Sequence, residues 1–209
     1  MAPITEVVLI TLVPDADYTA ITESVAILSR QPGCLAVRAS RLREEVSKVH
    51  YFIDWDSVSS HYAFARNKEV YAPFRALVGS VMEAYAPPYH VPLGPYPLDV
   101  FDAGVVMVGK AWFPVEREDV EAAFEESAKL LREKGGDGFT GHVAQGWSLE
   151  EGIVFKGEQS RVFLFVVGWT SSEAYLKFRG SKVFGEVFSG VTGLETLREL
   201  EICSVDIKA

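Results

Sequence analysis

An internal repeat constrains the fold of this chain more than any other feature. Residues 51–64 read YFIDWDSVSSHYAF, and residues 165–178 read FVVGWTSSEAYLKF, aligned without a gap. Each segment has an apolar stretch ending in Trp, a short polar start after it, and Phe nine residues beyond the Trp; the match continues to Lys68 and Lys182. Self-similarity of this kind indicates that one structural unit occurs twice.

The residues around the repeat extend each copy to the order βαββαβ. The first copy predicts strands at about 7–10, 34–41, 48–55 and 85–93, with helices at about 15–30 and 56–82. The second predicts strands at about 105–108, 139–147, 161–169 and 200–207, with helices at about 116–134 and 170–190 and a loop at 150–158. Residues 7–10 match 105–108 in this alignment. The order is typical of a ferredoxin-like unit.

The third strands are apolar on both faces, which predicts how the copies pack. Phe163, Phe165 and Val167 alternate with Val162, Leu164 and Val166. A strand that is apolar on both faces is buried on both faces. We therefore expect an α+β chain with two ferredoxin-like repeats, residues 1–93 and 103–209, packed sheet to sheet within one chain. The Pro-rich stretch 94–102 would be an extended linker.

Charge and hydropathy limit the partners. The formal net charge is −9, without a basic run, so neither a nucleic acid nor an anionic membrane surface is expected as a partner. No apolar stretch is long enough to span a bilayer, and the N-terminus lacks the pattern of a signal peptide. Cys34 and Cys203 form no CxxC motif and are expected to be free thiols. We therefore expect a cytoplasmic protein.

The strand–Trp–helix pattern around Trp55 and Trp169, in a βαββαβ context, resembles the dimeric α+β barrel superfamily. That superfamily includes antibiotic-biosynthesis monooxygenases, haem-degrading monooxygenases, polyketide cyclases and stress-responsive barrel proteins. The resemblance implies a barrel made from two such units, here joined in a tandem form. It implies an internal pseudo-dimer, either as a monomer or as a homodimer of such chains.

The chain departs from the superfamily at its second helices. Many members carry His about nine residues after the Trp and again some five residues later. Phe64 and Glu69 stand at these places in the first copy, and Phe178 and Val183 in the second. These side chains cannot replace an imidazole that ligates haem or relays protons, so no catalytic residue carries over from the superfamily by match.

The sequence has no phosphate-binding Gly-rich loop, HExxH, CxxC or GxSxG motif. Its histidines are scattered, so a metal site would depend entirely on folding. We therefore predict neither a metal nor an organic cofactor. The candidate catalytic residues are the histidines His61, His50, His142 and His90.

His61 is the first candidate, because it begins the second helix, where the sister repeat has Tyr175, and because a neutral imidazole can transfer protons near pH 7. His50 stands where the repeat has Leu164. His142 has small neighbours, and His90 follows a Tyr in the Pro-rich end of the first copy. Each histidine also has an alternative role in packing or on a solvated face.

The leading hypothesis is a cofactor-independent enzyme of secondary metabolism that acts on a small hydrophobic, aromatic or polyketide-like substrate, as a cyclase or a monooxygenase. One alternative is a non-catalytic barrel that binds small molecules or responds to stress. Another is a haem-handling protein, which would show a visible absorbance band when haem is added. We expect any functional cavity between a sheet and its second helix, because Pro73 and Gly79 already interrupt that helix in the first copy.

Overall fold

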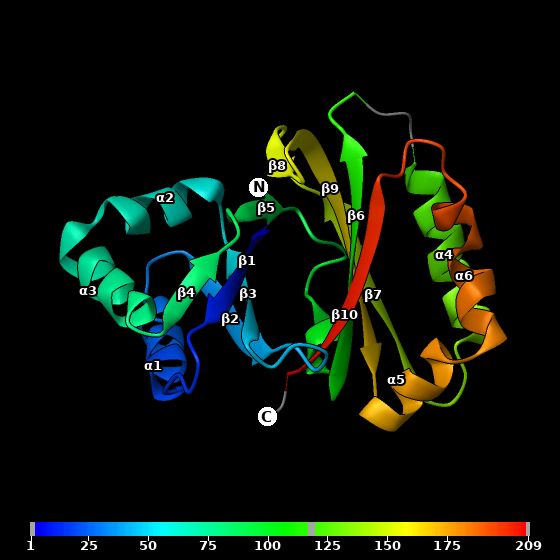
Figure 1. Cartoon of the computed structure of the whole chain (residues 1–209), viewed down its shortest axis with the longest axis horizontal. Helices are drawn as coiled ribbons and strands as arrows, with labels where there is room; N and C mark the ends of the chain where they lie inside the picture. Colours follow the sequence, from blue (N-terminus) through cyan, green and yellow to red (C-terminus); the bar gives the residue numbers. More distant parts are fainter. Residues whose placement is uncertain (1–2, 117–119, 208–209) are drawn as a thin grey trace. The chain divides into compact units, whose positions relative to one another are not determined.

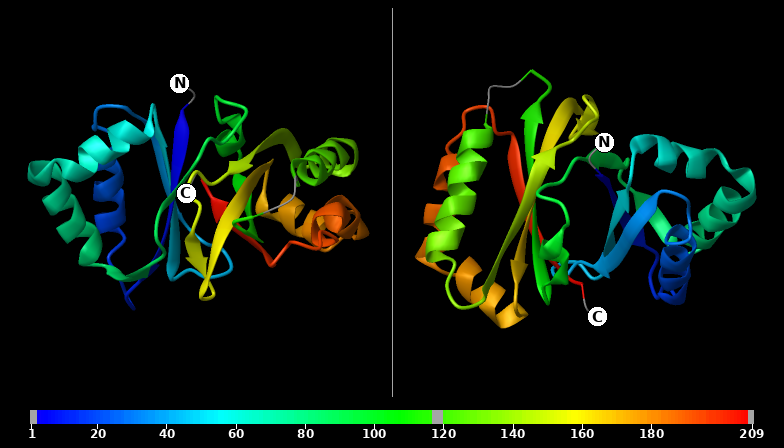
Figure 2. Two further views of the ribbon diagram at one scale, coloured as in Figure 1. Left: turned by 90° about the horizontal axis from the view of Figure 1, so that it is seen from above. Right: turned by 180° about the vertical axis from the view of Figure 1, so that it is seen from behind.

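The chain divides into two compact units, Met1–Pro92 and Leu93–Ala209. The computed structural model describes residues 3–116 and 120–207. Each unit contains an antiparallel sheet with its α-helices on one face of that sheet (Figures 1 and 2). The α+β class and the two ferredoxin-like repeats are therefore confirmed. The packing of the two sheets against one another stays a prediction.

The first unit has the strand order β2-β3-β1-β4, with β5 also paired to β1. The helices of this unit cover one face of its sheet (Figure 1). In chain order the elements are β1 (Ile4–Leu12), α1 (Thr19–Leu28), β2 (Cys34–Arg41), β3 (Lys48–Trp55), α2 (Val58–Arg66), α3 (Lys68–Gly79), β4 (Met82–Tyr85) and β5 (Tyr89–Val91).

The second unit has the strand order β10-β6-β9-β7, with β8 paired to β9. It opens with the short 3-10 helix η1 (Asp99–Asp102). Then follow β6 (Val105–Pro114), α4 (Glu121–Lys134), β7 (Phe139–Trp147), β8 (Ile153–Phe155), β9 (Glu158–Trp169), α5 (Ser172–Arg179), α6 (Lys182–Thr192) and β10 (Glu199–Asp206).

The second helix of each repeat is interrupted, but in the first copy the break is not at Pro73, where the sequence predicts it. In the first unit α2 and α3 meet at Asn67, and in the second α5 and α6 meet around Gly180 and Ser181. Pro73 lies inside α3 without breaking it. It stands in the second turn of this helix, where it removes one i→i−4 hydrogen bond but does not end the helix.

Strand register corrects the alignment of the first strands. Ile4 pairs with Trp55 in the first unit, and Val105 pairs with Trp169 in the second. Ile4 therefore corresponds to Val105, and the match of residues 7–10 with 105–108 is wrong by three residues. Short apolar runs without a marker residue can slide against one another, whereas Trp fixes the position of the third strand.

Three further boundaries differ from the prediction. The predicted fourth strand at 85–93 is two strands, because Pro87 and Pro88 cannot donate to the ladder. The first helix begins at Thr19 rather than near Asp15, where the backbone has a positive φ of 55°. The helix predicted from residue 116 is described from Glu121, and residues 117–119 lie outside the described residues.

The loop predicted at 150–158 contains a β-hairpin. Strand β8 pairs with the start of β9, and Lys156 and Gly157, both at positive φ, form the turn between them. Two consecutive residues at positive φ match the twist of an antiparallel hairpin. The Glu- and Gly-rich composition hid this pairing, because only three residues of β8 take part.

The stretch 94–102 begins the second unit. Gly94 exchanges backbone hydrogen bonds with Gln145 of β7, and η1 packs against β7 and β9. Leu98, Val100 and Phe101 are buried. Apolar side chains therefore anchor the part of the chain that the sequence marks as a linker.

The third strands are buried on both faces, as their apolar alternation predicts. All residues of β3 after Lys48 are buried, and so are residues 162–169 of β9. On the helix-facing side of the first sheet, Val49, Tyr51, Ile53 and Trp55 belong to the core under the helices. Tyr51 thereby faces the helices, and His50 faces the opposite side.

Candidate acid-base site

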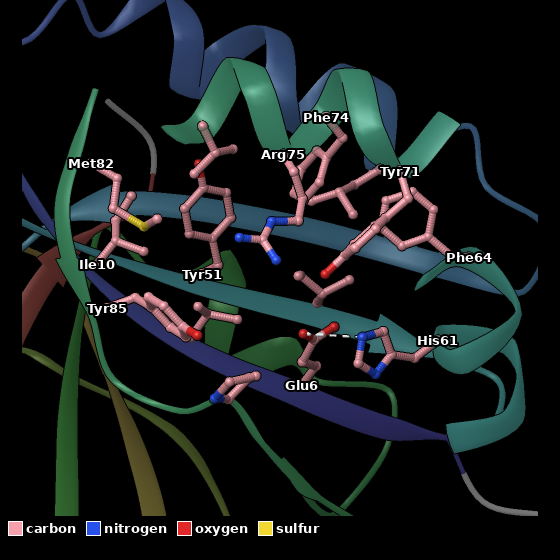
Figure 3. A pocket seen from close by; sticks show the side chains of 15 residues that line it. Glu6, Ile10, Tyr51, His61, Phe64, Tyr71, Phe74, Arg75, Met82 and Tyr85 are labelled. Carbon is pink, nitrogen blue, oxygen red and sulfur yellow. Dashed lines mark ion pairs between the residues drawn. The ribbon is translucent and has the colours of Figure 1, made fainter. Parts of the chain in front are cut away.

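A cavity of about 230 Å³ lies between the first sheet and helices α2 and α3 (Figure 3). This is the place where the sequence predicts a functional cavity. Its walls are mainly apolar, and an engineered apolar cavity of about 150 Å³ holds benzene. The residues that line it are Glu6, Val8, Ile10, Leu28, Tyr51, Ile53, His61, Phe64, Tyr71, Phe74, Arg75, Val78, Met82, Tyr85 and Pro88.

Polar groups from opposite walls converge on this apolar space. Glu6 reaches it from β1 and His61 from α2, while the guanidinium of Arg75 points into it from α3 (Figure 3). Tyr85, which is 57% exposed, lies where the cavity meets solvent. An apolar pocket with a few convergent polar groups is the usual form of a small-molecule site.

His61 lies between a carboxylate and a second imidazole. Its Nε2 is 3.5 Å from Oε1 of Glu6, and its Nδ1 shares a hydrogen bond of 2.8 Å with Nε2 of His90. Glu6 and His90 are buried, and the His61 side chain is 13% exposed. A protonated His61 can donate to both neighbours, so the pair stabilises the imidazolium form.

Regular elements hold all three residues in place. Glu6 and His90 face each other in the register of β1 and β5. The indole N–H of Trp55 donates to Oε2 of Glu6 at 2.9 Å, which fixes the carboxylate. The His61 ring also packs on Trp55, with 5.6 Å between centroids.

The start of α2 sets the position of His61. Ser57 caps the helix, because its hydroxyl accepts from the backbone N–H of Ser60 at 3.2 Å. The N–H of Asp56 donates to the carbonyl of Gly33, which has a positive φ of 80° and lies against Ser60. Only glycine fits such a close approach at positive φ without strain.

Tyr51 lines the cavity with an uncharged side chain. Burial raises the pKa of its hydroxyl to about 12, although the hydrogen bond to Ser24 opposes this shift. The Ser24 hydroxyl donates to the Ile21 carbonyl, so Tyr51 donates to Ser24 across 2.8 Å. Tyr51 therefore stays protonated near pH 7 and does not act as a base there.

The structure joins two of the four candidate histidines. His61 and His90 are hydrogen-bonded, although 29 residues separate them. His50 is buried on the other face of β3, where its ring stacks on Phe52, and His142 is exposed on β7. The alternation of side chains along β3 turns His50 away from the cavity that Tyr51 lines.

The corresponding place in the second unit lacks these groups. By strand register and repeat spacing, Met107 replaces Glu6, Tyr175 replaces His61 and Ser204 replaces His90. Phe165 and Phe188 stand where the first unit has Tyr51 and Phe74. At this place, within the described part of the second unit, lies a void of about 10 Å³, lined by Phe124, Ser127, Ala128, Leu131, Val143, Gln145, Phe165, Val167 and Phe188.

Sequence reasoning missed Glu6, Tyr71 and Arg75. A signal for Glu6 was present, because Ile4, Glu6, Val8 and Ile10 alternate along one face of a strand. A single acid on an otherwise apolar strand face marks an exception to the core pattern. Tyr71 and Arg75 gave no such signal, since a helix next to solvent ordinarily carries Tyr and Arg.

The structure of this chain is similar to several solved structures of other proteins. No family model matches the chain, and no curated protein matches its sequence. An anthrone oxidase-like protein matches with a TM-score of 0.68 and 13% identity, over 100% of this chain and 92% of its own. A protein named "putative monooxygenase" from Fusobacterium nucleatum subsp. nucleatum matches with a TM-score of 0.63 and 13% identity, over 100% and 93%.

A third solved structure, named "Putative Chlorite dismutase", matches with a TM-score of 0.58 and 12% identity, over 100% of this chain and 96% of its own. At these identities the likeness establishes the fold alone. The chain therefore shares its α+β fold, with two repeats in one polypeptide, with these three proteins.

Two further observations concern the whole chain. Among residues 3–116 and 120–207, no helix combines the length and the apolar character that a bilayer crossing requires. Neither Cys34 nor Cys203, both among the described residues, takes part in a disulfide bond.

Proposed function

We propose that the first unit is an acid-base enzyme that acts on a small acidic aromatic or enolic compound. The observation that carries the proposal is the position of His61, between Glu6 and His90 at the wall of an apolar cavity. General acid-base catalysis needs a proton acceptor within reach of a bound substrate. The Glu6–His61 pair supplies that acceptor, and the hydrogen bond between His61 and His90 helps to stabilise the proton that the pair gains.

Among the reactions that such a base can start, we favour oxidation by molecular oxygen. Removal of a proton from an activated CH₂ group, as in an anthrone, gives an electron-rich carbanion. Reaction with O₂ then converts CH₂ to C=O, and the second oxygen atom and both hydrogen atoms leave as water. The likeness to an anthrone oxidase-like protein and to a protein named a monooxygenase supports this choice.

The same proton abstraction would also serve a polyketide cyclase, in which the carbanion attacks a carbonyl group of the same molecule. The two reactions share this first step and differ at the second. A binding protein without catalysis is the rival. The cluster of Glu6, His61 and His90, of which Glu6 and His61 line the cavity, favours the enzyme.

The test is oxygen uptake with 1,8-dihydroxyanthrone, with the anthraquinone product followed by absorbance. We expect the wild-type protein to exceed the uncatalysed rate, and His61→Ala to lower turnover at least about tenfold with little change in the melting temperature. The matched control is Tyr175→Phe in the second unit, which should keep full turnover.

Two outcomes would contradict the proposal. If His61→Ala keeps full turnover, the base lies elsewhere. If the wild-type protein neither consumes oxygen with an anthrone nor cyclises a linear polyketone, which loss of water would reveal by mass spectrometry, the first unit is a binding module.

A further inference from the structure

Glu6, His61 and His90 carry one ligand atom each that could hold a metal ion. These three atoms lie within 4.8 Å of one another. The residues come from three elements, β1, α2 and β5, so the sequence scatters them while the fold gathers them. Two imidazoles and one carboxylate form a donor set that binds Zn²⁺ and Fe²⁺ in proteins.

The distances within the cluster are close to what a metal ion requires. Ligand atoms about 2.0–2.2 Å from a tetrahedral Zn²⁺ ion lie roughly 3.3–3.6 Å apart. The His61 to His90 hydrogen bond is 2.8 Å, and the His61 to Glu6 separation is 3.5 Å. Because His61 turns a different ring nitrogen to each neighbour, a common site requires its ring to rotate.

The surroundings also favour a metal ion. Metal-binding carboxylates are usually held by a further hydrogen bond, and Trp55 supplies one to Oε2 of Glu6 while Oε1 is turned to His61. Glu6 and His61 line the cavity, so an ion there would keep an open coordination position facing it. An open position of this kind distinguishes catalytic from structural zinc sites.

We propose that Glu6, His61 and His90 bind one divalent transition metal ion, with Zn²⁺ as the reference ion. The second unit has Met107, Tyr175 and Ser204 at these places and offers no such donor set, so the chain binds one ion in this way. The metal site uses the same residues as the proposed acid-base function, and the two exclude one another, because a nitrogen of His61 that ligates a metal cannot accept a proton. Bound Zn²⁺ should therefore inhibit that reaction.

The test is calorimetric titration of the chelator-treated full chain with Zn²⁺, and with Co²⁺ as a spectroscopic probe. We expect saturable binding of one Zn²⁺ per chain and a visible Co²⁺ absorption band. His90→Gln and Glu6→Gln should each weaken Zn²⁺ binding by at least about tenfold. His142→Ala, which removes an exposed histidine, should leave it unchanged.

Three outcomes would overturn the metal site: no saturable binding, unchanged affinity in both His90→Gln and Glu6→Gln, or lost affinity in His142→Ala. Circular dichroism and thermal melting show whether His90→Gln or Glu6→Gln is misfolded. If one of them is, the Co²⁺ band of the other variant tests the metal site. Oxygen uptake by the metal-free protein is measured separately. Oxygen uptake tests the acid-base function alone, and the titration tests the metal site alone. Failure of one proposal can therefore be distinguished from failure of the other.

Discussion

His61 and Tyr175 occupy the same place in the two repeats, yet their surroundings give them different chemistry. His61 has Glu6 and His90 within reach, whereas the Tyr175 hydroxyl accepts from Arg179 at 2.9 Å. The Trp residues show the same contrast. The Trp55 indole donates to Glu6, and the Trp169 indole N–H has no hydrogen-bond partner within the described ranges. One carboxylate on β1 accounts for much of this difference.

Arg75 should select the charge of the ligand. Its guanidinium points into the cavity, so an anionic group on an aromatic ligand can pair with it. Arg75→Met should weaken binding of 1-naphthoate about five- to tenfold, since the side chain is exposed and its ion pair partly screened. Binding of uncharged 1-naphthamide should stay the same, as measured by calorimetry.

The control for this prediction is Arg66→Met, which removes an exposed arginine of α2 that does not line the cavity. Equal weakening of both ligands in Arg75→Met would show that the substitution distorts the cavity rather than removing a charge.

Cys34 should react slowly with alkylating reagents. Burial raises the pKa of its thiol to about 11, and the charges of Asp54 and Glu6 act in the same direction. The thiolate is the reactive form, so at pH 8 the folded protein should be alkylated at Cys34 roughly 100-fold more slowly than the unfolded chain. The rate should rise as pH approaches 11, which peptide mass spectrometry after iodoacetamide treatment can follow. A rate equal to that of the unfolded chain would show an exposed thiol.

Among the elements, α2 connects the repeat to the site. Ser57 and Ser171 occupy matching positions and cap α2 and α5 in the same way, with extended backbones and side chains that accept from the third residue beyond. The cap therefore belongs to the shared fold. The site depends on a residue further along each helix, which is His61 in α2 and Tyr175 in α5.

Gly33→Ala should disturb the start of α2. Gly33 has a φ of 80°, and a Cβ there would lie 2.5 Å from the Cβ of Ser60. We expect a loss of unfolding free energy of about 2–4 kcal/mol, from backbone strain and overpacking together. Oxygen uptake should fall as well, because α2 carries His61. Chemical denaturation measures the first effect.

Gly79→Ala is the matched control. A Cβ at Gly79 meets nothing within 4 Å, and this glycine ends α3 without a positive φ. Its unfolding free energy should stay the same or rise slightly. Equal stability of the two variants would argue against a structural role for Gly33.

For the molecule as a whole, the repeats have the same fold but differ in what lies under their second helices. The first unit has a cavity there, and in the second Phe124, Phe163, Phe165 and Phe188 pack against one another. Gly109 makes this filling feasible, because the ring of Phe165 occupies the space of its missing Cβ. The second unit has a filled core, and the first has room for a ligand.

One aromatic ligand should therefore bind per chain. Calorimetry with 1-naphthoate should give a stoichiometry of one, and Val78→Trp, which adds bulk to the cavity wall, should abolish binding. Leu176→Trp, at an exposed position of α5, should leave binding intact. Two ligands per chain, or binding that persists in Val78→Trp, would contradict the assignment of the site to the first unit.

Sequence by itself determined the fold class, the two repeats and most strands. Trp55 and Trp169 mark the ends of strands that neighbouring apolar residues define, and β2, β3 and β7 have the predicted bounds. Such patterns are local and repeated, so they can be read without the fold. Register of the first strands, the break in the fourth strand and the β8 hairpin depend on pairing with a distant strand.

Tertiary structure alone decided where the candidate site lies and which residues form it. Glu6, His61 and His90 are separated by 55 and 29 residues, and no motif joins them. They meet because β5 returns beside β1 and because α2 begins next to Gly33. His50 and His142 were also candidates in the sequence, but side-chain alternation turns His50 to the opposite face of the sheet, and His142 is exposed on β7. Proximity of this kind is a property of the folded chain, since each contact depends on elements that pair across long stretches of sequence.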